Sequence, residues 1–340
     1  MTGQTGLRRR RGGLALASLS AVLLGSTPVL GKLALEAGLP PLAVVAFRTA
    51  AAALLLLLAL LPRRGSLTIF PLGLIGCLLA GALNGIGSLF FYAGLARVDA
   101  GVGQMLFGLY PVWVALLLFL DGQRPSRMSL GALALGLPAV YLITSARWQQ
   151  VDPLGAGFML LAGMLFGLHI PINERVLYEV PAPTVAFYTL VAMTLIVGPA
   201  FLIFGAPSPT VTTSALLPLL GLTAVTFVSR VALFSGVKSI GGLQSSLFGL
   251  AEVLVALALA YAALGETLSS AQQLGGILLG AALVISGIDR SPGQRAHRKG
   301  WLYWLRPPVP AIGPALVGGP SIPQGGEATL AEDEPLPRAS

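Results

Sequence analysis

The chain has little of three things: cysteine, histidine and charge. It contains one cysteine, Cys77, and two histidines among 340 residues, which excludes an internal disulfide and argues against a histidine-based metal centre. Charged residues make up 10% of the chain, against about 25% in soluble domains. The sequence also lacks a glycine-rich phosphate loop ending in Lys-Ser or Lys-Thr, and a nucleophile elbow. We therefore expect no cofactor, no metal and no enzymatic activity, and an ATP-driven pump has no support.

Hydrophobic residues, by contrast, make up 55% of the chain, and they fall into ten successive apolar runs. Each run has about 19–26 residues, enough to cross a hydrocarbon core of about 30 Å at 1.5 Å per helical residue. One such run could be a buried core helix, but ten leave too little polar surface for a soluble protein. We predict an all-α integral membrane protein with ten transmembrane helices. The runs are 13–32, 42–61, 70–95, 100–120, 128–146, 154–176, 184–204, 215–237, 242–264 and 270–288.

The chain also contains two related halves, about 140 residues apart. Leu106-Phe107-Gly108-Leu109 recurs as Leu247-Phe248-Gly249-Leu250, and Ala46-Phe47-Arg48-Thr49 recurs as Ala186-Phe187-Tyr188-Thr189. Because each half has an odd number of spans, the second half starts on the opposite side of the membrane. We predict two inverted five-helix repeats, an arrangement in which transporters hold substrate at the repeat interface. The predicted organisation is a basic N-terminus (1–12), a first repeat (13–149), a second repeat (150–288) and a disordered cytoplasmic tail (289–340).

The basic residues predict the orientation. Of the 21 Lys and Arg residues, sixteen fall on the side of the N-terminus, three fall on the other side, and Arg48 and Arg230 lie within spans. By the positive-inside rule, both termini of this multi-pass protein face the cytoplasm, and we expect the inner (plasma) membrane as its location. The basic residues form no aromatic-interleaved platform, so no nucleic-acid partner is expected.

The two ends of the chain carry their own signals. Arg8–Arg11 before an apolar run also fits a signal peptide, but the run is too long and no convincing cleavage site ends it. Residues 291–340 are rich in Pro, Gly and polar residues, which is typical of disorder. Trp301, Tyr303 and Trp304 stand among basic residues and could rest on the inner leaflet; the alternative is an inert tail.

Four charged or histidine side chains lie inside predicted spans and away from their ends, where a charge costs at least about 2.5–3.5 kcal/mol. Glu252 could carry a proton or bind a cationic group, or could be a structural partner of an arginine. Arg230 could hold a substrate carboxylate, pair with Glu252, or extend to the interface. For Arg48 the favoured interpretation is structural: its side chain pairs with another group or extends toward the outer membrane surface. His169, close to Pro171, lines a cavity or packs in the core.

Further polar side chains lie in the third and fourth spans. Asn84, Ser88 and Tyr92 follow one another at helical spacing, and this stripe should face the bundle or a wet cavity rather than lipid. Tyr110 marks the middle of the fourth span, where Phe107 and Trp113 could form an aromatic wall. The candidates for substrate binding or coupling are therefore Asn84, Ser88, Tyr92, Tyr110, His169, Arg230 and Glu252, with Arg48, Gln104 and Trp113 as secondary candidates.

Three glycine pairs have the spacing of close-packed membrane helices. Helices within one chain use this spacing as readily as helices of a dimer, so the pairs leave a homodimer open as an alternative. The pairs are Gly81/Gly85, Gly163/Gly167 and Gly276/Gly280.

Several short motifs follow one another along the chain: Gly25-Ser26-Thr27-Pro28 with Lys32, Arg48, Tyr110-Pro111-Val112, and Leu264-Gly265-Glu266 followed by Gln273 and Gly275. In this order they resemble the EamA-type branch of the drug/metabolite transporter superfamily. The resemblance covers roughly residues 13–288, in two copies. It implies a ten-helix inverted-repeat fold, secondary transport by alternating access, and export of amino acids, related metabolites or toxic compounds.

The chain departs from that pattern in two places. It has Glu252-Val253 where the family usually reads Glu-Pro, and the first copy has Gly122-Gln123 where a Gly-Glu ending would stand. The repeat alignment sets either Pro111 or Tyr110 opposite Glu252, and we prefer Tyr110. For Glu266 the resemblance implies a structural role at the outer end of the ninth span.

The sequence thus predicts a secondary transporter in a lipid bilayer that exports a small polar metabolite, such as an amino acid, with proton coupling as a further expectation. One alternative is an importer or facilitative exchanger of metabolites or drugs. An alternative of another class is a non-transporting membrane enzyme or scaffold that acts on lipid-linked substrates. The sequence fixes neither the substrate nor the direction, because both depend on cavity shape and on small energy differences between states.

Overall fold

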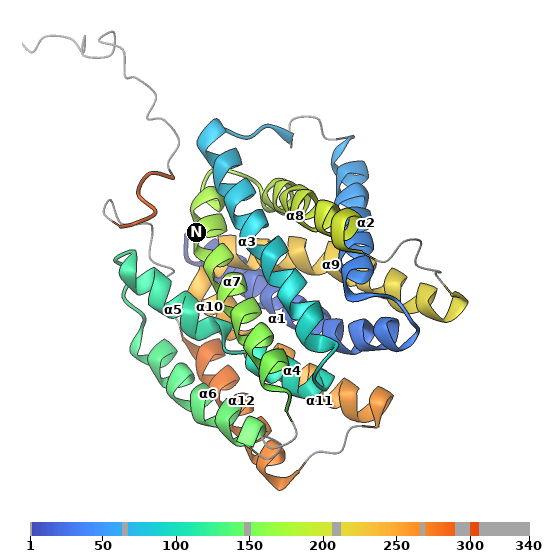
Figure 1. Ribbon diagram of the computed structural model, residues 1–340. Helices are drawn as coiled ribbons and strands as arrows, with labels where there is room; N and C mark the ends of the chain where they lie inside the picture. The colour runs from blue at the N-terminus through green and yellow to red at the C-terminus, as the bar shows by residue number, and fades with distance from the viewer. Residues whose placement is uncertain are drawn as a thin grey trace, which may run out of the picture. The chain divides into compact units, whose positions relative to one another are not determined.

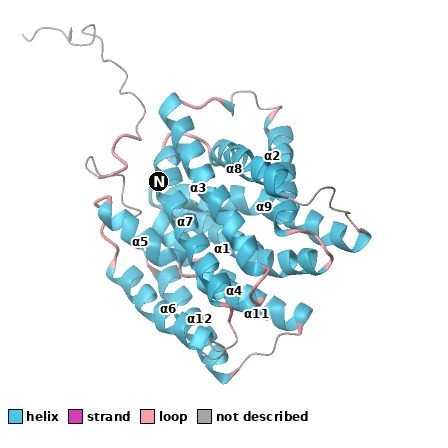
Figure 2. Ribbon diagram, in the orientation of Figure 1, coloured by secondary structure: helices cyan, strands magenta, loops and turns pink. Residues whose placement is uncertain are grey.

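The computed structural model describes residues 2–62, 67–145, 151–205, 212–265, 269–289 and 300–305 (Figures 1 and 2). These residues form helices, turns and loops without any strand, so the all-α prediction is confirmed for this part of the chain. The helices are α1 (Thr2–Glu36), α2 (Pro41–Leu60), α3 (Pro71–Leu95), α4 (Ala100–Phe107), α5 (Tyr110–Leu120), α6 (Arg127–Ser145), α7 (Pro153–Leu177), α8 (Ala182–Phe204), α9 (Thr213–Ile240), α10 (Gly242–Leu247), α11 (Leu250–Leu264) and α12 (Ser270–Ile288).

Local sequence explains many of the helix ends. Proline lies in the first turn of α2, α3, α7 and α8, where its fixed φ suits a helix and its missing N–H costs no bond. Asp152 also caps α7, since its side chain accepts a hydrogen bond from the backbone N–H of Leu154. At its C-terminal end, α11 stops at Gly265, whose φ of 67° is a left-handed conformation that favours glycine.

Two predicted spans are each interrupted in the middle. The fourth span consists of α4 and α5, and the ninth of α10 and α11, with both breaks inside the repeated Leu-Phe-Gly-Leu motif. Short-range hydrogen bonds tighten each break: Leu109 donates to Leu106 at 3.4 Å, and Gly249 donates to Ser246 at 2.9 Å. The two breaks lie close together, because α4 packs on α11 and α5 packs on α10.

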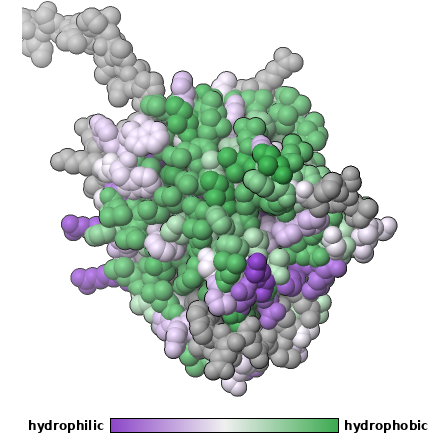
Figure 3. Space-filling view, in the orientation of Figure 1, coloured by the Kyte–Doolittle hydropathy of each residue, from purple (hydrophilic) through white to green (hydrophobic). Residues whose placement is uncertain are grey.

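Eight helical segments within the described residues are long and apolar enough to cross a membrane, counting each interrupted span once. The other two predicted spans, α6 and α12, have 19 residues each and pack side by side (Figure 1). Apolar residues cover most of the face seen in Figure 3, as expected for a surface in contact with lipid. The total of ten transmembrane helices remains a prediction.

The packing between the two halves follows a two-fold pattern. If the five spans of one half are matched in order to those of the other, α1 corresponds to α7, α2 to α8, and α3 to α9. The contact of α1 with α9 then has its counterpart in the contact of α3 with α7. The pairs α2–α8 and α6–α12 are their own counterparts. This exchange is what two repeats related by a pseudo-two-fold axis require.

Polar contacts gather at two opposite ends of the bundle. At the first, called here the basic end, Arg175 pairs with Asp121, and Lys238 donates to the carbonyl of Val180 at 2.8 Å. The basic end also holds residues 300–305, where the backbone N–H of Leu302 donates to Asp121 at 3.1 Å. At the opposite end, Lys32 donates to the carbonyls of Leu95 and Val98, and Arg97 pairs with Asp152.

The loops thus fall at the two ends of the bundle as the assignment of successive loops to opposite sides of the membrane requires. Which end faces the cytoplasm remains a prediction. Leu302 and Leu305 are buried against Ile172 of α7, inside the stretch predicted to be disordered. The described part of that tail consists of residue 289 and residues 300–305.

Two of the three glycine pairs are used inside the chain. A Cβ on Gly81 would lie 2.5 Å from the carbonyl of Thr189 on α8, and one on Gly163 would lie 2.8 Å from the carbonyl of Phe107 on α4. Gly280 of α12, in contrast, has no atom within 4 Å of such a Cβ. The pairs on α3 and α7 therefore serve packing within the chain, and the homodimer stays a prediction.

Candidate central cavity between the two halves

The broken helices bring a carboxyl group to the centre of the bundle. Glu252 lies in the first turn of α11, where the helix dipole favours a negative charge. The hydroxyl of Tyr110, the first residue of α5, donates to Glu252 Oε1 at 2.8 Å. The amide of Gln104 on α4 donates to Oε2 at 3.4 Å. Glu252 is buried, and donors from both halves of the first broken span hold it in place.

The buried Arg230 of α9 reaches a second group of polar side chains. Its Nη1 lies 3.3 Å from His169 Nε2 on α7. With its amide oxygen toward the arginine, Asn84 of α3 accepts hydrogen bonds from Nη1 and Nη2 at 2.9 and 2.8 Å. The guanidinium also lies over the ring of Phe166, 5.4 Å from its centre.

His169 has a defined role in this group. Its Nδ1 contacts the backbone carbonyl of Phe166, and an acceptor there requires the proton on Nδ1. Nε2 is then left as an acceptor for Arg230. The neutral imidazole therefore orients the arginine without adding a second positive charge beside it.

The second arginine, Arg48 of α2, has a separate set of partners. It donates to the hydroxyl of Thr226 on α9 at 2.9 Å and to that of Ser88 on α3 at 3.4 Å. Its guanidinium lies over the ring of Tyr92, 5.0 Å from the ring centre. Arg48 is 6% exposed, so it pairs inside the bundle and does not extend toward the membrane surface.

These groups surround a small cavity whose free volume is about 40 Å³, enough for a few water molecules. Both halves of the chain contribute to its wall. Arg48 and Arg230 each keep an Nε without a partner among the described residues. Two guanidinium groups with unused N–H donors, together with one carboxyl group, can bind a solute that has both an acidic and a basic group. The polar lining residues are Thr27, Arg48, Asn84, Ser88, Gln104, Arg230 and Glu252.

Comparison with known proteins places this arrangement in a family. The model of the EamA-like transporter family matches the chain twice, over residues 11–145 and 153–288. The chain belongs to the EamA-like transporter family.

Individual relatives agree with this assignment. A protein described as an uncharacterized transporter, from Archaeoglobus fulgidus, is 26% identical over 197 residues, which cover 58% of this chain and 70% of the relative. A protein of known crystal structure matches 80% of this chain and 95% of its own, with a TM-score of 0.63 and 20% sequence identity. The likeness to that structure concerns the fold alone.

In this EamA-like chain, the structure brings most of the predicted site residues together. Asn84, Ser88, Arg230 and Glu252 line the cavity, as do the secondary candidates Arg48 and Gln104. Tyr92, Tyr110 and His169 stand behind that lining, in contact with its charged groups. The polar stripe of α3 faces the bundle, as predicted, through its contacts with the two arginines.

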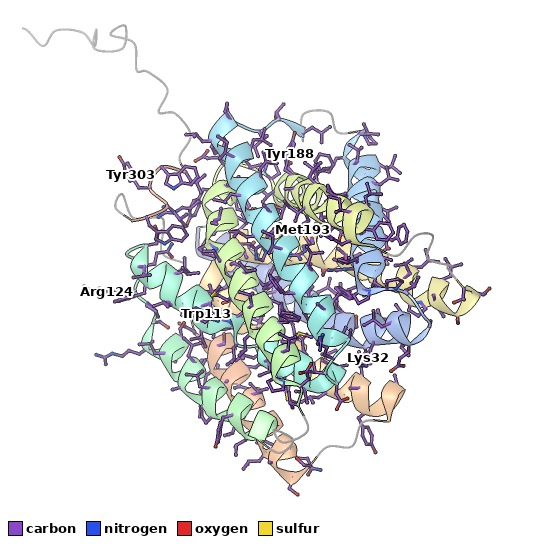
Figure 4. The ribbon with its side chains drawn as sticks, in the orientation of Figure 1. Lys32, Trp113, Arg124, Tyr188, Met193 and Tyr303 are labelled. Atoms are coloured by element: carbon purple, nitrogen blue, oxygen red, sulfur yellow. The ribbon has the colours of Figure 1, made fainter. Side chains whose placement is uncertain are left out.

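Trp113 lies apart from this group. It is on α5 (labelled in Figure 4), 36% exposed, and a Cβ on Gly167 of α7 would meet its Cβ at 2.8 Å. Of the two aromatic residues expected there, Phe107 lines the cavity, together with Phe91 and Phe166. The sequence prediction missed Phe166, although it lies one helical turn before His169 and therefore on the same face of α7.

One of the alternatives given for Arg230, a pairing with Glu252, differs from the structure. The partners of Arg230 in the structure are His169 and Asn84, and no ion pair joins it to Glu252 among the described residues. Glu266 lies outside the described residues.

Proposed function

We propose that this EamA-like protein is a secondary transporter that exports a small polar metabolite, such as an amino acid, by alternating access, with proton coupling through Glu252. It would reside in the inner (plasma) membrane with both termini in the cytoplasm. Family membership establishes a membrane transporter in general terms. The substrate, the direction and the coupling are the proposal.

One observation carries it: a polar cavity, lined by Arg48, Arg230 and Glu252, lies beside the two helix breaks and between the halves. Buried charges at this depth are costly, and in membrane proteins they mark solute and ion pathways. A solute carboxylate would bind the unused N–H donors of the arginines. An ammonium group on the same solute would face Glu252.

Glu252 offers a physical route to coupling. As a carboxylate, it accepts hydrogen bonds from both Tyr110 and Gln104. A protonated Glu252 presents an O–H donor and so loses an acceptor position toward one of them. Because these donors stand on α5 and α4, on either side of the first break, protonation would bias how the two broken spans pack. A proton could thus favour one orientation of the halves over the other.

The first test is solute counterflow in liposomes that contain the purified protein. Labelled amino acids, nucleosides and organic cations would be offered to vesicles preloaded with the same unlabelled compounds. Counterflow of amino acids alone supports the proposal, and counterflow of organic cations alone would assign another substrate class. Transport measured in vesicles of known sidedness, with and without a pH gradient, separates export from import and exchange. Binding without movement of any compound would favour the scaffold hypothesis.

Coupling is tested by Glu252→Gln, which keeps the side-chain shape but cannot carry a proton. We expect counterflow at equal pH on both sides to persist, and the stimulation by a pH gradient to disappear. Glu179→Gln is the matched control, since Glu179 is an exposed carboxylate in the turn after α7. A pH-gradient response that is unchanged in Glu252→Gln would refute the coupling role.

A further inference from the structure

A second and larger cavity lies at the basic end of the bundle, separate from the central one. Its free volume is about 360 Å³, against about 40 Å³ for the central cavity. Its wall comes from both halves: the loop between α5 and α6, the end of α7, the junction of α9 and α10, and the end of α12. The polar residues that line it are Gln123, Arg124, Ser126, Ser129, Glu174, Gln244 and Asp289.

Most of these polar groups are engaged in holding the wall together. Asp289 Oδ2 accepts hydrogen bonds from Ser126 and Ser129, which ties the start of α6 to the end of α12. Gln244 donates to the backbone carbonyls of Ser286 and Asp289 at 3.1 and 2.9 Å. These contacts shape the cavity.

Glu174 of α7 is different. It is 5% exposed, and its Oε1 accepts a single hydrogen bond, from the backbone N–H of Gly242 at 3.0 Å. Its Oε2 has no partner among the described residues. The guanidinium of the neighbouring Arg175 forms its ion pair with Asp121, and no ion pair joins it to Glu174 among the described residues. A buried carboxyl oxygen without a partner carries a desolvation cost, and a cationic donor that reaches it offsets that cost.

The backbone of Gly242 lies directly against the carboxyl group of Glu174. A Cβ on Gly242 would lie 2.6 Å from Oε2, so any side chain at that position would crowd the carboxylate. Arg124 is exposed at the outer part of the wall, and the carboxyl group of Glu174 lies inside. A solute bound with its amine at Glu174 would have its other end toward the outer wall.

We infer that this cavity is a second binding site, in which Glu174 takes the protonated amine of a small solute before that solute reaches the central cavity. The inference rests on the transporter function proposed above. Both cavities border α7, which carries Glu174 at one and Phe166 at the other. A loading site for amines at the basic end would supply a central site that holds a carboxylate and an amine.

The test measures the charge preference of the cavity without any transport. In the full-length protein in detergent, Cys77→Ala removes the one native cysteine, which is buried, and Ser126→Cys places a thiol in the cavity wall. The probes are 2-aminoethyl methanethiosulfonate, a cation, and 2-sulfonatoethyl methanethiosulfonate, an anion of similar size. We expect the cation to react faster by about tenfold, relative to the ratio for a free thiol, because a buried carboxylate concentrates cations locally.

Glu174→Gln should reduce this preference to the part that Asp289 beside position 126 contributes, whereas Glu174→Asp and the exposed control Glu179→Gln should keep it in full. Butylammonium, but not butyrate, should slow the labelling of the Ser126→Cys protein. Equal reaction rates, a preference that is undiminished in Glu174→Gln, or a thiol that reacts with neither probe would overturn the inference. If Glu174→Gln fails to fold, butylammonium protection decides, and equal protection by butyrate overturns the inference. Failure here leaves counterflow intact, so it is distinguishable from failure of the proposed function.

Discussion

At the scale of single residues, two aspartate–arginine ion pairs within the described residues lie in different surroundings. The side chains of Arg175 and Asp121 are 2% and 0% exposed, and those of Arg97 and Asp152 are 49% and 33% exposed. The buried pair is also the attachment point of Leu302, whose backbone N–H donates to Asp121. Loss of one charge should therefore matter far more at the basic end than at the opposite end.

Asp121→Asn should destabilise the protein by about 3–5 kcal/mol, because it leaves the buried charge of Arg175 without a partner. Thermal unfolding of the purified protein in detergent measures this. Asp152→Asn is the matched control and should unfold close to the unaltered protein, since water screens an exposed pair. Equal effects of the two substitutions would contradict the assigned burial.

The exposed pair also has a predictable dependence on pH. The hydrogen bond from Arg97 lowers the pKa of Asp152 below the usual aspartate value. The small contribution of the Arg97–Asp152 pair to the stability of the fold is therefore present above the usual aspartate pKa. It is lost as the pH falls through the lowered pKa of Asp152.

The sequence reveals those site residues whose charge is unusual within a membrane-spanning segment. Arg48, Arg230 and Glu252 stand alone within apolar runs, and a charge there requires a partner, so all three were found. Glu174 was missed because it lies beside Arg175 at the end of a run, where charges also arise from orientation. Only the fold shows that Arg175 turns to Asp121 and leaves Glu174 unpaired.

At the scale of helices, the central feature is the pair of breaks at Leu-Phe-Gly-Leu. Length and hydropathy predicted where the spans lie, because both depend on composition. They did not locate the breaks, because a break at mid-membrane is stable only when another element covers the freed backbone. Gly163 of α7 provides part of that cover, since it lets α7 approach the carbonyl of Phe107 at the end of α4.

Gly163→Ala should therefore destabilise the protein by about 1–3 kcal/mol, because the added methyl group meets backbone that cannot move aside easily. Gly157→Ala is the control on the same helix, since a Cβ there meets no atom within 4 Å. Thermal unfolding should show a lower midpoint for the first variant, and for the second a midpoint at or slightly above that of the unaltered protein. A harmless Gly163→Ala would show that α7 and α4 are less closely packed than described.

At the scale of the whole molecule, the sequence repeat and the packing agree. The contacts of α1 with α9 and of α7 with α3 exchange the two halves, and so do the contacts between the broken spans. The sequence predicted the duplication because glycines and Leu-Phe-Gly-Leu recur. The sequence did not decide which residue of the first half corresponds to Glu252. In the structure the hydroxyl of Tyr110 donates a hydrogen bond to Glu252, but this contact does not by itself make the two residues equivalent positions of the repeats.

The two-fold arrangement around a central cavity supports the proposed alternating access, in which the cavity opens to each side in turn. The free volume of about 40 Å³ is too small for the proposed amino acid substrate, so the helices around it would have to separate during transport. Ser88 is well placed to report this, because its small side chain lines the cavity and is 7% exposed.

The most direct test labels Ser88→Cys in the Cys77→Ala protein, in membrane vesicles of both orientations, with the membrane-impermeant anion 2-sulfonatoethyl methanethiosulfonate. The account predicts that the thiol reacts from both faces of the membrane and is protected from each face by a transported solute. Labelling from one face only, or from neither, would contradict a cavity that opens alternately to the two sides.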